Sequence, residues 1–231
     1  MLRLRPSNER GYAEHGWLKS FHSFSFSNYF DRNHMHFRSL RVMNEDWIDP
    51  NSGFPTHPHD NMEIITYVIE GRLAHKDSMG NVEEIQPGEI QCMSAGTGIT
   101  HSEFNPSDSD TTHLYQIWLM PAEKNIKPGY QQIRYDRAPS GELTLLASQN
   151  PSEGAVFINQ DVNLYRAELN SGDEVSFKIE PGRAVWIQLV DGELDVNGEQ
   201  MQTGDGLAVE DEPGLVMSTD SHAEFLLFDL N

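Results

Sequence analysis

The chain has 231 residues, of which 37% are hydrophobic, and it carries a net charge of −20. Its 18 Gly, 12 Pro and ordinary hydrophobic content favour a folded, turn-rich β protein with one large domain or two modest ones. The sequence has no run of about 20 apolar residues and no apolar segment near its start, which disfavours a membrane span and a secretory signal. The single cysteine, Cys92, excludes an internal disulfide and a four-cysteine zinc site. We therefore predict a cytoplasmic protein that does not attach to membranes.

Charge and histidine are distributed unevenly along the chain. Residues 138–231 carry 18 acidic residues against three basic ones, whereas residues 1–137 carry 18 against 13. A field of this sign repels phosphate backbones, so direct binding to nucleic acid is disfavoured, while a basic protein partner is not. Nine of the ten histidines lie between His15 and His113. Histidine chemistry is therefore expected in the first half.

Short apolar runs typical of β-strands recur along the whole chain, and turn signals such as Pro87-Gly88 and Asn197-Gly198 separate them. Sustained helical periodicity is absent. We predict strands within residues 40–43, 63–69, 89–93, 112–119, 143–146, 184–190 and 224–228. The pattern predicts an all-β protein made of antiparallel sandwiches or barrels.

The polar segment around residues 126–141 is the predicted linker between two domains. The runs 69–73 and 190–194 on its two sides resemble each other, since both place an acid and a glycine before a tight hairpin. Together with the chain length, this echo favours a duplicated β-barrel. The predicted domains are residues 1–125 and 142–231.

Two short pairs of residues with metal-binding side chains suggest a metal site. His57 and His59 form a His-x-His pair, and His101 and Glu103 form a second pair further along. Side chains at positions i and i+2 of a strand project from the same face, so each pair can point inward. Two such pairs on facing strands would bring three imidazoles and one carboxylate to one point. This donor set suits Fe(II), Mn, Ni, Co, Cu or Zn.

The alternative is that His57 and His59 are ordinary polar residues near a loop. The second pair, preceded by the turn Gly96-Thr97-Gly98, argues against it. His75 and Asp77 flank another turn, where a solvated hairpin is the simpler interpretation.

Three segments carry a resemblance to a known family. Residues 56–71 resemble the first cupin motif, and residues 98–105 resemble the second. The runs 22–29, 56–64 and 93–103 look more specifically like the signatures of pirins. The resemblance implies a bicupin, with two antiparallel jelly-roll barrels facing each other, in which only the N-terminal barrel holds a metal.

The resemblance also implies roles for individual residues. The metal ligands carry over to His57, His59, His101 and Glu103, with Fe(II) as the expected divalent ion. Glu63, a ligand in many other cupins, is expected beside the ligands, where it can orient an imidazole. When the matching glycines of the two halves are aligned, the second-half positions that correspond to the four ligands are Lys178, Glu180, Met217 and Thr219. We therefore predict that the second half binds no metal.

Two functions remain open. The first is a quercetin 2,3-dioxygenase that cleaves a flavonol with O2 and releases CO, with Glu103 accepting the substrate's hydroxyl proton. Its partners are a small aromatic substrate and O2, and the protein is expected to be a monomer. Phe24 or Phe26 can wall the substrate pocket, although the run 22–26 also fits a half-buried strand. The second function is an iron-dependent regulatory module that acts through protein contacts, as eukaryotic pirin is described to do.

Overall fold

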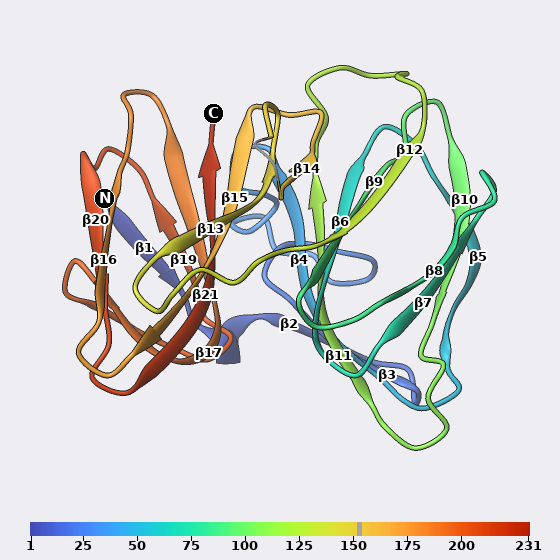
Figure 1. Cartoon of the computed structure of the whole chain (residues 1–231), viewed down its shortest axis with the longest axis horizontal. Coiled ribbons are helices and arrows are strands. Elements are labelled where there is room, and N and C mark those ends of the chain that lie inside the picture. Colours follow the sequence, from blue (N-terminus) through green and yellow to red (C-terminus); the bar gives the residue numbers. More distant parts are fainter. Residues whose placement is uncertain (152–153) are drawn as a thin grey trace. The chain divides into compact units, whose positions relative to one another are not determined.

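The structure is a computed structural model that describes residues 1–151 and 154–231. These residues form 21 strands and one short 3-10 helix, η1 (Ser7–Glu9). No helix in the described part of the chain is long and apolar enough to cross a membrane. The fold is nearly all β, which confirms the predicted all-β class (Figure 1).

The chain divides into two compact units, which we call the histidine-rich unit (residues 11–135 and 150–160) and the acidic unit (residues 1–10, 136–149 and 161–231). This division places the boundaries elsewhere than the predicted domains 1–125 and 142–231. The first strand belongs to the acidic unit because it pairs with a strand at residues 206–209. Part of the predicted linker is a strand, residues 129–134, of the histidine-rich unit.

The histidine-rich unit contains two sheets, which Figure 1 shows as two layers with strands running past each other. The larger sheet has the order β12-β9-β6-β11-β4-β3-β2 and the smaller one β5-β10-β7-β8. Its strands are β2 (Gly11–Glu14), β3 (Leu18–His22), β4 (Leu40–Ile48), β5 (Gly53–His59), β6 (Glu63–Glu70), β7 (Leu73–Asp77), β8 (Val82–Ile85), β9 (Glu89–Ser94), β10 (Ile99–Phe104), β11 (Thr112–Leu119), β12 (Gly129–Arg134) and β14 (Val156–Phe157).

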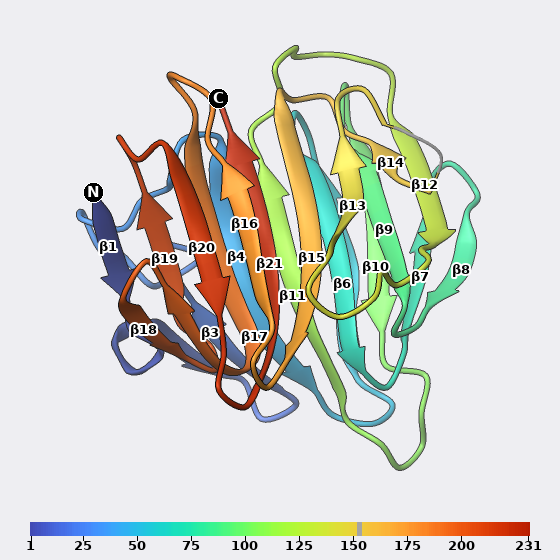
Figure 2. The same cartoon turned by 60° about the vertical axis from the view of Figure 1, so that its left-hand side comes forward.

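The acidic unit is built on a sheet with the order β1-β19-β17-β21-β15-β13, and β16, β18 and β20 complete it. Figure 2 shows these strands in a second view. Its strands are β1 (Leu2–Arg5), β13 (Leu143–Ser148), β15 (Val162–Asn170), β16 (Glu174–Lys178), β17 (Ala184–Val196), β18 (Glu199–Gln202), β19 (Gly206–Val209), β20 (Gly214–Ser218) and β21 (His222–Leu230).

All seven predicted strand runs are strands in the structure. The Asn197-Gly198 turn joins β17 to β18 with φ values of +51° and +90°, the left-handed conformation that a tight two-residue hairpin requires. Along each strand, successive side chains point to opposite faces of the sheet, so every second side chain can enter the core.

Apolar side chains fill the interior of the acidic unit. Met217, which corresponds to one of the ligand positions of the first half, is fully buried among these apolar side chains. Lys178 and Glu180 instead form an exposed ion pair at 2.6 Å. That this unit binds no metal stays a prediction.

Candidate metal centre

The three predicted histidine ligands lie together at one end of two neighbouring strands. His101 of β10 is directly opposite His57 of β5 in the antiparallel register. The ring centroids of His57, His59 and His101 are 4.5 to 4.9 Å apart. The three imidazoles therefore lie together, on adjacent hydrogen-bonded strands of one sheet and not on facing strands.

A β-bulge between β5 and β10 lies next to these histidines. The register shifts between His101 and Glu103, so Glu103 is opposite Phe54. A Cβ atom added to Gly53 would lie 2.1 Å from the carbonyl oxygen of Glu103, so only glycine allows this approach of the two backbones. The local sequence thus fixes the position from which Glu103 enters the interior.

The hydrogen bond of His57 determines which of its nitrogens can bind a metal. Its Nδ1 lies 2.8 Å from the carbonyl oxygen of Pro55, which can only accept a hydrogen bond. The proton of the neutral ring is therefore on Nδ1, and the lone pair is on Nε2. That Nε2 lies 3.0 Å from Nε2 of His101. Two nitrogens that each bind one ion at ~2.1 Å and at a right angle are about 3.0 Å apart, so this spacing fits a shared metal.

Burial keeps two of the imidazoles neutral. Loss of solvent, together with the neighbouring imidazoles, lowers the pKa of His59 to about 4. The same causes, with His57 and His75 as the neighbours, lower the pKa of His101 to about 3. Neutral rings offer the lone pairs that a metal needs, and protons compete for them only in acid.

Glu103 is held by a residue that the sequence analysis did not identify. Nε2 of Gln116, on β11, donates to both carboxylate oxygens of Glu103, at 3.0 and 3.2 Å. Oε2 of Glu103 lies 3.9 Å from Nε2 of His101. The sequence feature that could have identified Gln116 is its polar side chain on the same strand face as Leu114 and Trp118, within an otherwise apolar run.

The prediction of a solvated turn at His75 and Asp77 was wrong. His75 is 1% exposed and Asp77 is 7% exposed. Strand β7 pairs with β10 so that His75 is opposite Glu103, and both side chains face the interior. Donor atoms of His75, His101 and Glu103 lie within 4.8 Å of one another, so these three residues form a second possible donor set.

Glu63 lies outside both donor sets. Its Oε2 accepts hydrogen bonds from the Ser94 hydroxyl at 2.7 Å and from the Asn159 backbone N–H at 3.1 Å. Burial raises the pKa of Glu63, although these two hydrogen bonds oppose the shift. Among the described residues it makes no hydrogen bond to an imidazole, so the expected orienting role is not seen.

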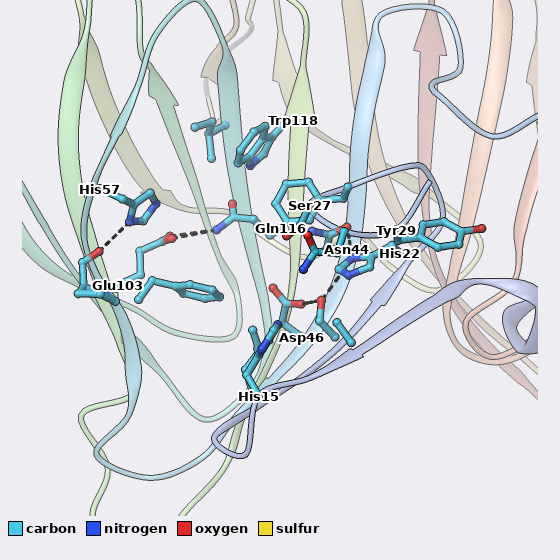
Figure 3. Close-up of a pocket in the computed structure, with 18 of the residues that line it drawn as sticks. His15, His22, Ser27, Tyr29, Asn44, Asp46, His57, Glu103, Gln116 and Trp118 are labelled. Atoms are coloured by element: carbon cyan, nitrogen blue, oxygen red, sulfur yellow. Dashed lines mark hydrogen bonds between the residues drawn. The ribbon is translucent and has the colours of Figure 1, made fainter. Parts of the chain in front are cut away.

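The donor atoms open into a cavity of about 560 Å³ between the two sheets (Figure 3). Phe26 and Trp118 are part of its apolar wall and meet edge to face, with their centroids 5.4 Å apart. Phe24 is buried and does not line it. Strand β3 ends at His22, so the predicted strand over residues 22–26 is not formed. Neither lysine nor arginine occurs among the described lining residues, so a bound cation would balance the Glu103 carboxylate.

A two-sheet β unit with histidine and carboxylate donors lining the cavity between its sheets has the architecture of a cupin with a candidate metal site. Residues 3–119 match the Pirin family, and residues 145–230 match the family described as quercetinase C-terminal cupin domain. The chain therefore belongs to the pirin family.

Curated relatives and solved structures agree with this assignment. Quercetin 2,3-dioxygenase of Escherichia coli K12 is 50% identical over 230 residues, which cover 100% of this chain and 99% of that protein. A pirin-like protein of Caulobacter vibrioides is 37% identical, with 99% of each chain covered. A crystal structure of a bacterial pirin from Escherichia coli in complex with nickel(II) superposes with a TM-score of 0.96 at 49% identity, covering 100% of this chain and 99% of that one.

Proposed function

We propose that this protein is a metal-dependent dioxygenase that cleaves quercetin or a related flavonol with O2 and releases CO. The observation that carries the proposal is the grouping of His57, His59 and His101, with Glu103 3.9 Å from His101, at the wall of a largely apolar cavity. The names of the relatives in Escherichia coli and other bacteria support the same reaction.

The four side chains would hold one divalent transition metal. Three neutral imidazoles and one carboxylate suit Fe(II), Ni(II), Co(II), Mn(II), Cu(II) and Zn(II). The nickel(II) complex of the Escherichia coli pirin supports the binding of a divalent ion. Fe(II) is the ion that we propose for the native protein, because the resemblance to pirins implies it.

Glu103 has the geometry of a proton acceptor. Its carboxylate is 4% exposed, and Gln116 holds it at the edge of the cavity. It would take the proton of the flavonol 3-hydroxyl, which leaves an electron-rich substrate oxyanion. The bound metal supplies Lewis acidity and a template for the substrate and O2.

The cavity walls supply orientation and exclude water. Trp118 and Phe54 contribute aromatic surface beside the histidines, with Trp118 4.8 Å from His59 and Phe54 6.3 Å from His57 between ring centroids. A flat aromatic substrate fits between such walls, which hold it beside Glu103. In the balanced reaction both oxygen atoms of O2 enter the ring-opened product, and the carbon that bore the 3-hydroxyl leaves as CO.

The proposal is tested by O2 uptake with quercetin after loading with each candidate metal in turn. We expect uptake and CO release by the wild-type protein and loss of both in His101→Ala. His36→Ala is the matched control, because His36 is exposed and its hydrogen bond within the described part of the chain is to the Arg38 carbonyl, at 3.0 Å. If no loaded form consumes O2 with quercetin, the dioxygenase assignment fails, and a regulatory module that binds protein partners becomes the better account.

A further inference from the structure

A second polar cluster lies in the cavity, on the larger sheet. In the strand register, Thr66, Gln116, Asn44 and His22 occupy one row across β6, β11, β4 and β3. Ser20 and Asp46 are paired two residues further along β3 and β4, and therefore point to the same side. We call Ser20, His22, Asn44 and Asp46 the distal cluster, and all four line the cavity.

The distal cluster is separate from the candidate metal ligands. His22 lies two strands away from Gln116, the residue that holds Glu103. With neighbouring strands about 4.8 Å apart, the row extends roughly 10 Å from Gln116 to His22. Figure 3 shows Asn44, His22 and Asp46 grouped on one side of the cavity and His57 and Glu103 on the other.

The contacts within the distal cluster leave two polar atoms open. Asn44 Oδ1 lies 2.8 Å from Nδ1 of His22 and accepts its hydrogen bond, while the Ser20 hydroxyl donates to Oδ1 of Asp46. Among the described residues, Nδ2 of Asn44 and Oδ2 of Asp46 have no hydrogen-bond partner. Both residues are 3% exposed. Both residues line the cavity, so the partner open to these atoms is a group inside it, either water or a polar group of a bound ligand.

The two open atoms define the chemistry of that partner. The Asn44 amide nitrogen donates a hydrogen bond, and Oδ2 of Asp46 accepts one when ionised and can donate one when protonated. A hydroxyl group, which both donates and accepts, matches the pair in either state. Anionic groups are disfavoured because Glu103 lines the same cavity and the described lining residues include no lysine or arginine. Aromatic side chains line the same cavity, among them Phe26, whose ring centroid is 5.4 Å from that of His22.

We propose that the distal cluster is a substrate-binding subsite that recognises aryl hydroxyl groups on the part of the substrate remote from the metal ligands. This inference rests on the proposed function for its substrate class. It adds that ring hydroxylation, and not aromatic shape alone, determines which flavonols bind tightly. Asn44 and Asp46 are then the specificity-determining residues, and Ser20 and His22 position them.

The test compares two ligands that share the 3-hydroxyl. Quercetin carries further ring hydroxyls, and 3-hydroxyflavone carries none. Dissociation constants are measured by quenching of tryptophan fluorescence, in the metal-free and the nickel-loaded protein. We expect the wild type to bind quercetin about tenfold more tightly, the discrimination that one to two net hydrogen bonds provide. Asn44→Leu and Asp46→Leu, which keep side-chain volume, should each bring the ratio of the two constants close to one while 3-hydroxyflavone still binds.

The control is Ser27→Ala, which removes a hydroxyl from an exposed position on the cavity lining outside the distal cluster and should leave the ratio unchanged. If Asn44→Leu does not fold, Asp46→Leu carries the test. A wild-type ratio near one, or an unchanged ratio in a folded variant, overturns the subsite. If the ratio behaves as expected but O2 is never consumed, the subsite stands and the proposed function fails. If O2 is consumed but the ratio is unchanged in the folded variants, the proposed function stands and the subsite fails.

Discussion

Gln116 donates its side-chain amide to both carboxylate oxygens of Glu103, at 3.0 and 3.2 Å, and so joins the two sheets of the histidine-rich unit at the candidate metal centre. Gln116 in turn lies 3.4 Å from the Thr66 hydroxyl, measured from its Oε1. The carboxylate is therefore oriented before substrate binds. A group that must accept a proton benefits from such fixed placement.

Gln116→Leu tests this relationship. We expect a loss of roughly 10- to 100-fold in kcat, as is typical when a residue that orients a ligand is removed, while the three imidazoles still retain metal. Metal content by mass spectrometry and O2 uptake with quercetin are measured on the same samples. Gln132→Leu is the control, because Gln132 bonds to Glu84 and Glu89 outside the cavity. Full activity in Gln116→Leu would show that Glu103 needs no such support.

Glu103→Gln separates metal binding from proton transfer. The amide cannot accept the substrate proton, so we expect activity to fall about 10²- to 10⁴-fold while the protein still binds metal through its histidines. The control is Glu83→Gln, since Glu83 is exposed on β8. A Glu103→Gln protein that keeps wild-type kcat would remove Glu103 from its proposed catalytic role.

Asp46 should make stability depend on pH. Burial, with the nearby charges of Glu103 and Glu45, raises its pKa from 3.8 to about 7, although the hydrogen bond from Ser20 opposes the shift. Because the folded-state pKa is the higher one, the proton stabilises the native state fully below about pH 4, and this contribution is lost as the pH rises through about 7. The expected loss is at most ~4 kcal/mol.

Asp46→Asn removes this titration, so the stability of the wild type relative to the variant should fall between pH 5 and pH 8. Urea unfolding at both values measures it. Stability curves that stay parallel across this range would mean that Asp46 does not change its protonation state there.

The second donor set yields a discriminating prediction. His59→Ala should lose metal, whereas His75→Phe should retain it and preserve the ring contact with Tyr130, which is 4.9 Å between centroids. Added nickel(II) should therefore raise the melting temperature of His75→Phe but not of His59→Ala, since ligand binding to the native state stabilises it by mass action. The reverse pattern would assign the ion to His75, His101 and Glu103.

Local spacing was sufficient to predict the strands and to single out the His-x-His and His-x-Glu pairs. His57 and His59, like His101 and Glu103, are two residues apart, and alternation along a strand places such pairs on one face whatever the rest of the chain does.

Residues that act through strand pairing could not be found in this way. Gln116 meets Asn44, and Ser20 meets Asp46, only because β3, β4 and β11 pair in a particular register. No sequence spacing encodes those contacts. His75 was misread for the same reason, because the turn beside it is visible in the sequence, whereas its pairing with Glu103 is not.

The most direct test of the metal assignment is a crystal structure of the metal-loaded protein with anomalous diffraction at the absorption edge of the ion. We predict one ion bonded to His57, His59, His101 and a Glu103 oxygen, with nitrogen–metal distances of about 2.0 to 2.3 Å, the lower end being typical of zinc–imidazole bonds. An ion bonded to Glu63 with Glu103 turned away, or held by His75 in place of His57 and His59, would contradict the account.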